Sequence, residues 1–137
     1  MNLTEQARKI FATDRYATEL TGIEIASVGN HEATCTLTVG RDHSNARGVA
    51  MGGALYTLAD FAAAIAANSD CIDDGNLHWV SLDATAHYLA PAPSGNSVKA
   101  SCHALKHGRS TALYQTIIES LDNGKTLAIV ETTMIYA

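Results

Sequence analysis

The chain has 137 residues, a length that fits one domain with a substantial hydrophobic core. Hydrophobic residues make up 47% of the sequence and charged residues 17%, which is the balance of an ordinary globular protein and not of a disordered one. A formal net charge of −5 without a basic tract argues against nucleic-acid binding, because nothing in the sequence would neutralise a row of phosphates.

The cysteines and the N-terminal residues predict a cytoplasmic protein. Cys35, Cys71 and Cys102 are an odd number without metal-ligand spacing, so they fit free thiols in a reducing compartment better than a disulfide framework. No apolar stretch typical of a signal peptide follows the first residues. The longest apolar run, 61–67, is far too short to span a membrane. We therefore expect neither a signal peptide nor a membrane segment.

The first forty residues predict one helix and a pair of strands. Apolar residues recur at helical spacing near the N-terminus with charged residues between them, which predicts an amphipathic helix ending before Thr21 and Gly22. Residues 23–27 and 33–39 have the composition of short strands, with a turn at Gly29 and Asn30. The second strand alternates threonines with apolar residues, so we expect it to have one polar and one buried face.

A long apolar helix and four strands are predicted for the rest of the chain. Residues 52–68 are apolar nearly all round, which is typical of a buried helix wrapped by a sheet. The polar stretch 70–76 predicts a loop, and strands follow at 79–89, 97–105, 111–121 and 126–136. Turns are expected at His107-Gly108 and at Asn123-Gly124, a strong hairpin signal. The whole chain, 1–137, is thus predicted to be a single α+β domain.

Alternation in 79–89 predicts two distinct faces for this strand. One predicted face carries Val80, Leu82, Ala84, Ala86 and Tyr88, and the other carries Ser81, Asp83, Thr85 and His87. Pro91 and Pro93 end this strand.

Two glycines and one carboxylate in the predicted central helix point to chemistry. Gly52 and Gly53 open the helix, where free backbone N–H groups at the positive end of the dipole suit an anion or a carbonyl that becomes one. Close packing explains such a glycine pair equally well. Asp60 lies in the apolar run, where an unpaired carboxylate is costly, so we favour a functional role over a bond to a neighbour such as Thr57. Partial burial should raise its pKa and make it a better base.

This segment resembles the signature of hot-dog-fold acyl-CoA thioesterases, particularly the PaaI-like branch of the 4-hydroxybenzoyl-CoA thioesterase superfamily. That pattern is Asn-x-x-Gly-x-x-His-Gly-Gly, followed by apolar residues and Leu-x-Asp. The matching residues here are Asn45, Gly48, Gly52, Gly53, Leu58 and Asp60. Residues 80–91 also resemble the family's strand, which ends in Tyr-Leu-x-Pro. One position departs from the pattern, because Met51 stands where the family has histidine.

The resemblance implies a hot-dog fold, in which an antiparallel sheet wraps around one long helix, and roles for individual residues. Asn45 would hold the attacking water beside Asp60, although it fits a turn-closing role nearly as well. Ser81 matches a hydroxyl position near that water, and an exposed strand serine is an equal alternative. Gly52 and Met51 would line the substrate site, with Met51 altering the polar edge of the acyl pocket.

The remaining polar residues suggest a substrate contact and no metal. Lys106 and Arg109 belong to the only dense basic turn, which is either merely solvated or a site for the phosphates of coenzyme A. The histidines share no metal-ligand spacing, so no metal site is predicted, and neither a metal nor another cofactor is needed. No serine nucleophile elbow is present, which excludes an α/β-hydrolase.

Helix geometry predicts an oligomer. Asp60 follows Gly52 by eight residues, so on one helix it lies about 12 Å from the N–H donors. A base and an oxyanion site must both come within about 3 Å of the reacting group. Two antiparallel helices related by a two-fold axis satisfy this requirement, so we expect a homodimer, or a dimer of dimers, with shared sites.

The sequence therefore favours hydrolysis of an acyl-CoA thioester, with Asp60 as general base or nucleophile. The departure at Met51 keeps a second hypothesis open, a non-catalytic acyl-CoA-binding protein of the same fold. A hot-dog dehydratase is a weaker alternative, because those enzymes depend on a pocket histidine that this helix lacks.

Overall fold

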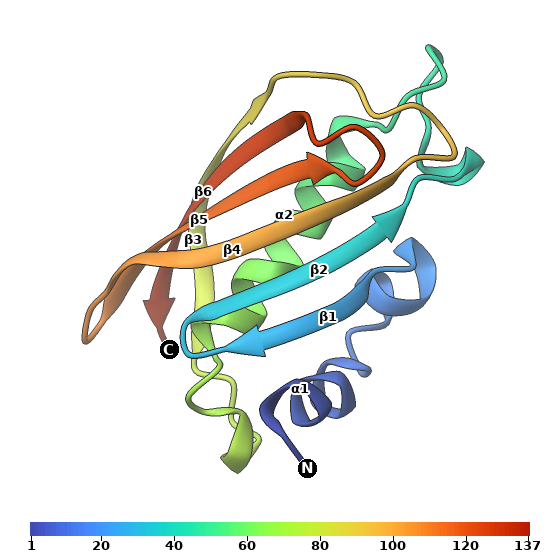
Figure 1. The fold of residues 1–137 in the computed structure, drawn as a ribbon. Coiled ribbons are helices and arrows are strands. Elements are labelled where there is room, and N and C mark those ends of the chain that lie inside the picture. Colours follow the sequence, from blue (N-terminus) through green and yellow to red (C-terminus); the bar gives the residue numbers. More distant parts are fainter.

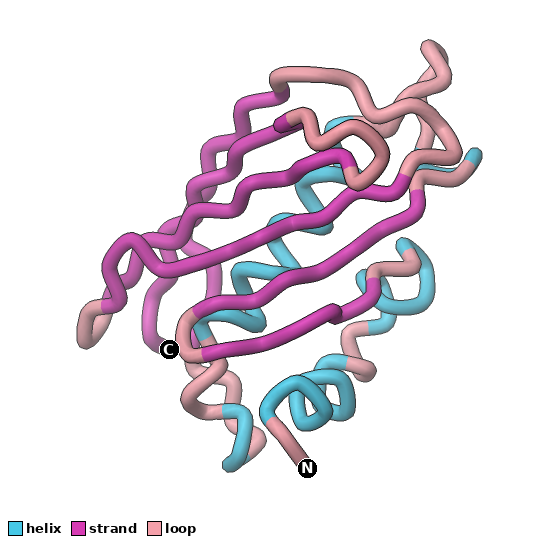
Figure 2. Tube along the Cα trace, in the orientation of Figure 1, coloured by secondary structure: helices cyan, strands magenta, loops and turns pink.

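A six-stranded antiparallel sheet curves around one long helix (Figures 1 and 2). The computed structural model describes residues 1–137. In chain order the elements are α1 (Leu3–Phe11), a π-helical turn (Tyr16–Thr21), β1 (Glu24–Gly29), β2 (Glu32–Thr38), a 3₁₀ turn (Arg41–His43), α2 (Gly52–Ala67), a second 3₁₀ turn (Ile72–Asp74), β3 (Trp79–Tyr88), β4 (Ser97–His107), β5 (Thr111–Ser120) and β6 (Thr126–Tyr136). The strand order in the sheet is β1-β2-β4-β5-β6-β3. This arrangement confirms the predicted α+β hot-dog fold.

Helix α2 fills the concave side of the sheet and contacts all six strands. Its buried residues are Leu55, Leu58, Ala59, Phe61, Ala62, Ala63, Ile65, Ala66 and Ala67. The alanines let the sheet approach the helix closely, and the larger side chains fill the space at its ends and sides. The prediction of a buried, wrapped helix is confirmed for most of α2, although Gly52, Ala54 and Tyr56 near its start are only partly buried. The sheet also leaves partly exposed a stripe at the spacing i, i+4, i+7, i+11 that runs along the helix. This stripe consists of Gly53, Thr57, Asp60 and Ala64.

One edge of the sheet is covered by a helix and the other is open. Helix α1 packs against β1, where Arg8 donates from Nε to the carbonyl of Ile25 at 3.0 Å and the hydroxyl of Thr4 accepts the N–H of Val28 at 3.0 Å. Strand β3 forms the opposite edge and pairs only with β6. Exposed apolar side chains, among them Leu82 at 58%, accompany this open edge. An uncovered apolar edge is a surface to which a further strand can be added.

A bulge in β3 makes the predicted alternation wrong for its first half. Ser81 pairs with Met134 and Asp83 with Thr133, so Leu82 is an extra residue in the strand. Ser81 therefore lies on the same face as Ala84, toward the helix, and not on the opposite face as predicted, whereas Val80 and Leu82 are exposed. A one-residue insertion reverses the facing of every residue on one side of it.

The N-terminal helix is also shorter than predicted. α1 ends at Phe11, and a π-helical turn at 16–21 follows before Gly22, whose φ of +84° closes that turn. The hairpin turns agree better with the prediction. A turn joins β5 and β6 as predicted, with a φ of +74° at Gly124, but the loop covers residues 121–125 and Asn123 has no positive φ, so it is not the two-residue Asn-Gly turn. Strand β2 has one buried face. No helix is long and apolar enough to cross a membrane.

Candidate active site

The glycine pair begins α2 and leaves two backbone donors free. Met51 is the N-cap residue, and its carbonyl accepts the N–H of Ala54 at 2.9 Å, but its side chain caps nothing. The N–H groups of Gly52 and Gly53 have no acceptor within the chain. They lie at the positive end of a sixteen-residue helix, so they can stabilise a negatively charged oxygen.

Different structural features account for glycine at positions 52 and 53. A Cβ on Gly52 would lie 3.1 Å from Cζ of Tyr88, so close packing against this ring explains Gly52. A Cβ on Gly53 would have no atom within 4 Å, and no positive φ requires a glycine there. Nothing within the protomer therefore accounts for Gly53. The open space where its side chain would lie is available to a group from outside the chain.

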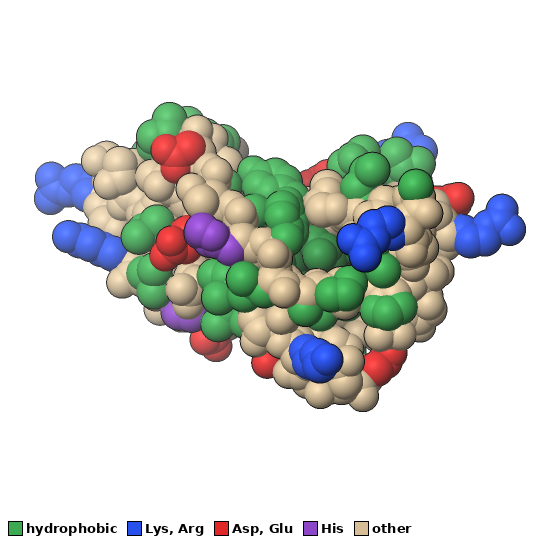
Figure 3. Space-filling view, turned by 90° about the horizontal axis from the view of Figure 1, so that it is seen from above, with side chains coloured by type: hydrophobic (Ala, Val, Ile, Leu, Met, Phe, Trp, Pro, Cys, Tyr) green, Lys and Arg blue, Asp and Glu red, His purple; other side chains and the backbone are tan.

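A groove of about 520 Å³ lies beside Gly52. It is lined by Asn45, Arg47, Val49, Ala50, Gly52, Leu55, Tyr88, Leu89, Ala90 and Pro91. Figure 3 shows the molecule from above, with a hollow between two lobes and hydrophobic side chains inside it. The groove combines an apolar floor with free N–H donors and one cation, Arg47. Sequence reasoning missed Arg47, although it lies within the motif, because a lone exposed arginine gives no signal of its own.

Asn45 closes its own loop. Its Oδ1 accepts the N–H of Arg47 at 2.9 Å and that of Val49 at 3.4 Å, and its backbone carbonyl accepts the N–H of Gly48 at 2.9 Å. The turn-closing alternative is therefore confirmed for Oδ1. The Nδ2 group has no partner within the chain, so it remains available as a donor at the groove.

Asp60 is held by Ser81 and by no cation. The Ser81 hydroxyl donates to Oδ1 of Asp60 at 3.2 Å, whereas the hydroxyl of Thr57 donates to the carbonyl of Gly53 at 2.9 Å. Burial raises the pKa of the Asp60 carboxyl, the hydrogen bond from Ser81 lowers that pKa in part, and the charge of Asp14 raises it. No ion pair includes Asp60. A partly buried, unpaired carboxylate with a raised pKa is the state expected of a general base.

Tyr56 is a second residue that the sequence did not single out. It lies one helical turn after Gly52 and one turn before Asp60, so the three share a face of α2. Burial and the negative charge of Asp60 raise the pKa of the Tyr56 hydroxyl, which therefore remains a donor at neutral pH. In the sequence, only its spacing of four residues from Gly52 and from Asp60 indicates that Tyr56 belongs to this face.

Comparison with known proteins agrees with this geometry. Residues 47–135 match the model of the thioesterase superfamily. The chain belongs to the thioesterase superfamily. It is 30% identical over 125 residues to acyl-coenzyme A thioesterase PaaI of Escherichia coli K12, covering 91% of this chain and 84% of PaaI. It is 27% identical over 127 residues to mouse acyl-coenzyme A thioesterase 13, covering 93% and 89%.

A solved structure gives the same result for the fold. The Escherichia coli PaaI protein of the phenylacetic acid degradation operon superposes with a TM-score of 0.83 at 27% identity, covering 99% of this chain and 96% of that one. The resemblance to PaaI-like hot-dog thioesterases is thus confirmed, and the protein is an enzyme of this superfamily.

In this thioesterase, Met51 and Gly53 line a second hollow of about 470 Å³ on the other side of the helix start. Tyr16, Leu20 and Thr57 also line it, and Met51 is 56% exposed there. The π-helical turn that carries Tyr16 and Leu20 is tied down by His43, whose Nε2 lies 2.6 Å from the carbonyl of Thr21. The structure therefore separates Met51 from Asn45, which faces the groove beside Gly52.

The basic turn of the thioesterase lies at the Asp60 end of the sheet. Ser81, Met134, Ala112 and His107 are consecutive partners across β3, β6, β5 and β4. Lys106 and Arg109 line a hollow of about 530 Å³ at this hairpin, whereas the glycine pair is at the opposite end of α2 (Figure 1). Lys106 and Arg109 thus lie at the level of Asp60 along the strands, although three strands away from Ser81 across the sheet, and not at the level of Gly53.

Proposed function

We propose that this thioesterase hydrolyses acyl-CoA thioesters at sites shared between two subunits. The observation that carries the proposal is the pair of free N–H donors at the start of α2 together with the unpaired Asp60 on the same helix. Support for the substrate comes from PaaI and thioesterase 13, relatives named for acyl-CoA hydrolysis.

The thioester carbonyl binds in the open space beside Gly53, and its oxygen accepts the free backbone N–H. A water molecule held by Nδ2 of Asn45 attacks the carbonyl carbon, and Asp60 accepts the proton of this water. The tetrahedral intermediate then breaks its C–S bond, and the proton passes from Asp60 to the leaving thiolate of coenzyme A. In the alternative path the Asp60 carboxylate attacks the carbonyl carbon and expels the thiolate of coenzyme A, and water then hydrolyses the mixed anhydride to release the acid and restore Asp60.

Two features of the protomer support a dimeric site. Gly53 and Asp60 are seven residues apart on α2, a rise of about 10 Å that one thioester carbonyl cannot bridge. The stripe of Gly53, Thr57, Asp60 and Ala64 is left partly exposed by the sheet, and the open β3 edge lies beside it. An antiparallel partner helix on this stripe brings Gly53 of one subunit to Asp60 of the other.

The same arrangement gives the cations a role. Lys106 and Arg109 lie at the Asp60 end of their own protomer, and Arg47 lies at the glycine end. In an antiparallel dimer these ends meet, so all three cations lie at the same end of the shared site and can attract the phosphates of coenzyme A despite the net charge of −5. We further place the enzyme in the cytoplasm as a single domain over 1–137, in keeping with its three free cysteines.

The rival proposal, a non-catalytic acyl-CoA-binding protein, rests on Met51 alone. Because the backbone donors do not depend on that side chain, we favour the enzyme. Met51→His distinguishes the two. An efficient enzyme changes mainly its preference toward polar or aromatic acyl groups, whereas a binder gains turnover with every substrate.

An assay of coenzyme A release over a panel of acyl-CoAs tests the function. We expect turnover with at least one acyl class, and a loss of kcat on the order of 10²-fold or more in Asp60→Asn, because a positioned base contributes that much. Binding of coenzyme A should be retained in the variant. Equal kcat in Asp60→Asn and the wild type would contradict the mechanism.

A further inference from the structure

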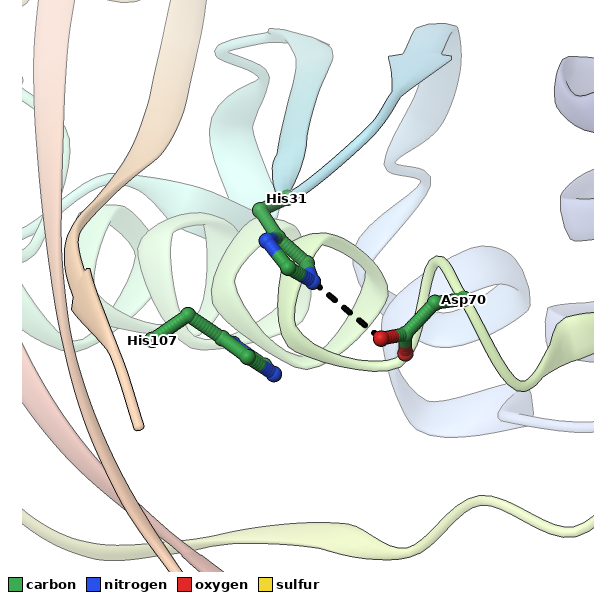
Figure 4. Close-up of side chains that lie close together, drawn as sticks. All are labelled: His31, Asp70 and His107. Carbon is green, nitrogen blue, oxygen red and sulfur yellow. Dashed lines mark hydrogen bonds and ion pairs between the residues drawn. The ribbon is translucent and has the colours of Figure 1, made fainter. Parts of the chain in front are cut away.

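Three ligand-type side chains from distant segments meet at the C-terminal end of α2. His31 lies in the β1–β2 turn, Asp70 follows α2, and His107 ends β4. One ligand atom from each lies within 4.8 Å of the other two, and Nε2 of His31 is 3.2 Å from Oδ2 of Asp70 (Figure 4). The imidazole rings of His31 and His107 are stacked with centroids 3.7 Å apart.

The surrounding residues orient both histidines. Nδ1 of His107 lies 2.7 Å from the hydroxyl of Tyr114, a fully buried residue, so Nε2 is the nitrogen left free. His31 has a φ of +56°, and its N–H donates to Oγ of Ser69 at 2.8 Å, which fixes the turn. A histidine whose second nitrogen is held by a polar partner has the arrangement found in metal ligands.

We propose that His31, Asp70 and His107 form a binding site for a divalent transition-metal ion of the Zn²⁺ class. Two imidazoles and one carboxylate are ligands that Zn²⁺, Ni²⁺ and Co²⁺ accept, whereas Ca²⁺ and Mg²⁺ require oxygen ligands. Metal–ligand bonds of about 2.1 Å place ligand atoms roughly 3 to 4 Å apart. To bind one ion together, the three side chains must therefore move by about 1 Å, and one imidazole ring must rotate out of the stack. The half-exposed Asp70 side chain allows this movement and leaves coordination positions for water.

The ion would connect the β1–β2 turn, the end of α2 and the β4–β5 hairpin. This site is separate from the proposed catalytic groups, because His107 lies three strands away from Ser81 in the sheet. The site could not be predicted from the sequence, since positions 31, 70 and 107 share no ligand spacing and come together only in the fold. The inference therefore stands or fails independently of acyl-CoA hydrolysis.

Titration of the chelator-treated protein with Zn²⁺ by calorimetry, and with Co²⁺ by visible absorption, tests the site. We expect one ion per chain and a Tm that rises with metal concentration. His31→Gln and Asp70→Asn should each weaken binding at least tenfold, and Tyr114→Phe should weaken it about tenfold by releasing His107. Asp70→Asn changes a half-exposed side chain, so its fold should be retained.

Two matched variants serve as controls. His103→Gln removes an exposed histidine of β4 outside the cluster, and Cys71→Ser removes the thiol next to Asp70. Both should bind the metal as the wild type does. The proposal is overturned if no saturable binding is found up to roughly millimolar metal, or if His31→Gln and Asp70→Asn bind with wild-type affinity.

Discussion

The hydroxyl of Ser81 donates a hydrogen bond of 3.2 Å to Oδ1 of Asp60, joining the edge strand β3 to the uncovered stripe of α2. The bulge at Leu82 makes this contact possible, because it turns Ser81 toward the helix. Ser81 thereby acts on the base, and its hydroxyl counteracts part of the rise in the pKa of Asp60 that burial causes.

Ser81→Ala should move the acidic limb of the kcat/KM profile to higher pH. A general base works in its deprotonated form, and loss of the hydrogen bond leaves burial to raise the pKa of Asp60 further. At a pH well above this limb, kcat/KM should fall much less than in Asp60→Asn. Steady-state kinetics against pH measure the shift, with Ser81→Thr as the control that keeps a hydroxyl. An unshifted limb in Ser81→Ala would show that Ser81 does not influence the base.

Asp60→Asn should make the protein more stable at neutral pH. The pKa of Asp60 is higher in the folded than in the unfolded chain, so folding is penalised once the pH is above the folded-state value. The amide removes this penalty, and we expect Tm to rise by roughly a few degrees. The gain should shrink as the pH falls through the folded-state pKa toward the unfolded-state one. Thermal unfolding at several pH values measures it, and a lower Tm for Asp60→Asn at neutral pH would contradict the assignment.

The glycine pair gives a comparison of two neighbouring substitutions. Gly53→Ala places a methyl group in open space, so the free energy of unfolding should be unchanged or higher, by up to about 1 kcal/mol from helix propensity. Its kcat/KM should still fall on the order of tenfold or more, because the methyl group takes up open space beside Gly53 that the thioester carbonyl is proposed to enter. Gly52→Ala must instead displace the Tyr88 ring, which should alter KM through the groove. Wild-type kcat/KM in a folded Gly53→Ala protein would exclude Gly53 as the binding point of the carbonyl.

The parts of the fold that depend on local patterns were predictable from the sequence. The apolar run 52–68 predicts α2 to within one residue, and Asn123-Gly124 predicts the turn between β5 and β6. Both predictions succeed because helix periodicity and turn chemistry depend on only a few neighbouring residues. Asp60 was recognisable because its neighbours in the run left no polar face for it.

What the sequence did not predict depends on contacts between distant segments. No residue type marks Leu82 as a bulge, so the contact of Ser81 with Asp60 required the register of β3 against β6. That Gly52 packs against a side chain and Gly53 does not becomes apparent only from the position of the Tyr88 ring in the fold. Likewise, residues 12–22 continue the helical pattern, yet the chain turns after Phe11 so that α1 can cover β1.

In the proposed mechanism each site takes Gly53 from one subunit and Asp60 from the other, and subunit mixing tests this sharing directly. Gly53→Pro removes the N–H donor near the start of a helix, where proline is best tolerated, and its ring enters open space. Asp60→Ala removes the base. Each variant alone should be folded, dimeric and inactive, as checked by circular dichroism and by mass.

The activity of the mixture after subunit exchange is the deciding measurement. In a mixed dimer one site carries both substitutions and the other carries neither, so random pairing should restore about a quarter of the wild-type activity. Exchange is confirmed by the mass of the mixed dimer, with each variant incubated alone as the control. If mixed dimers form and no activity returns, Gly53 and Asp60 do not act together across a subunit interface.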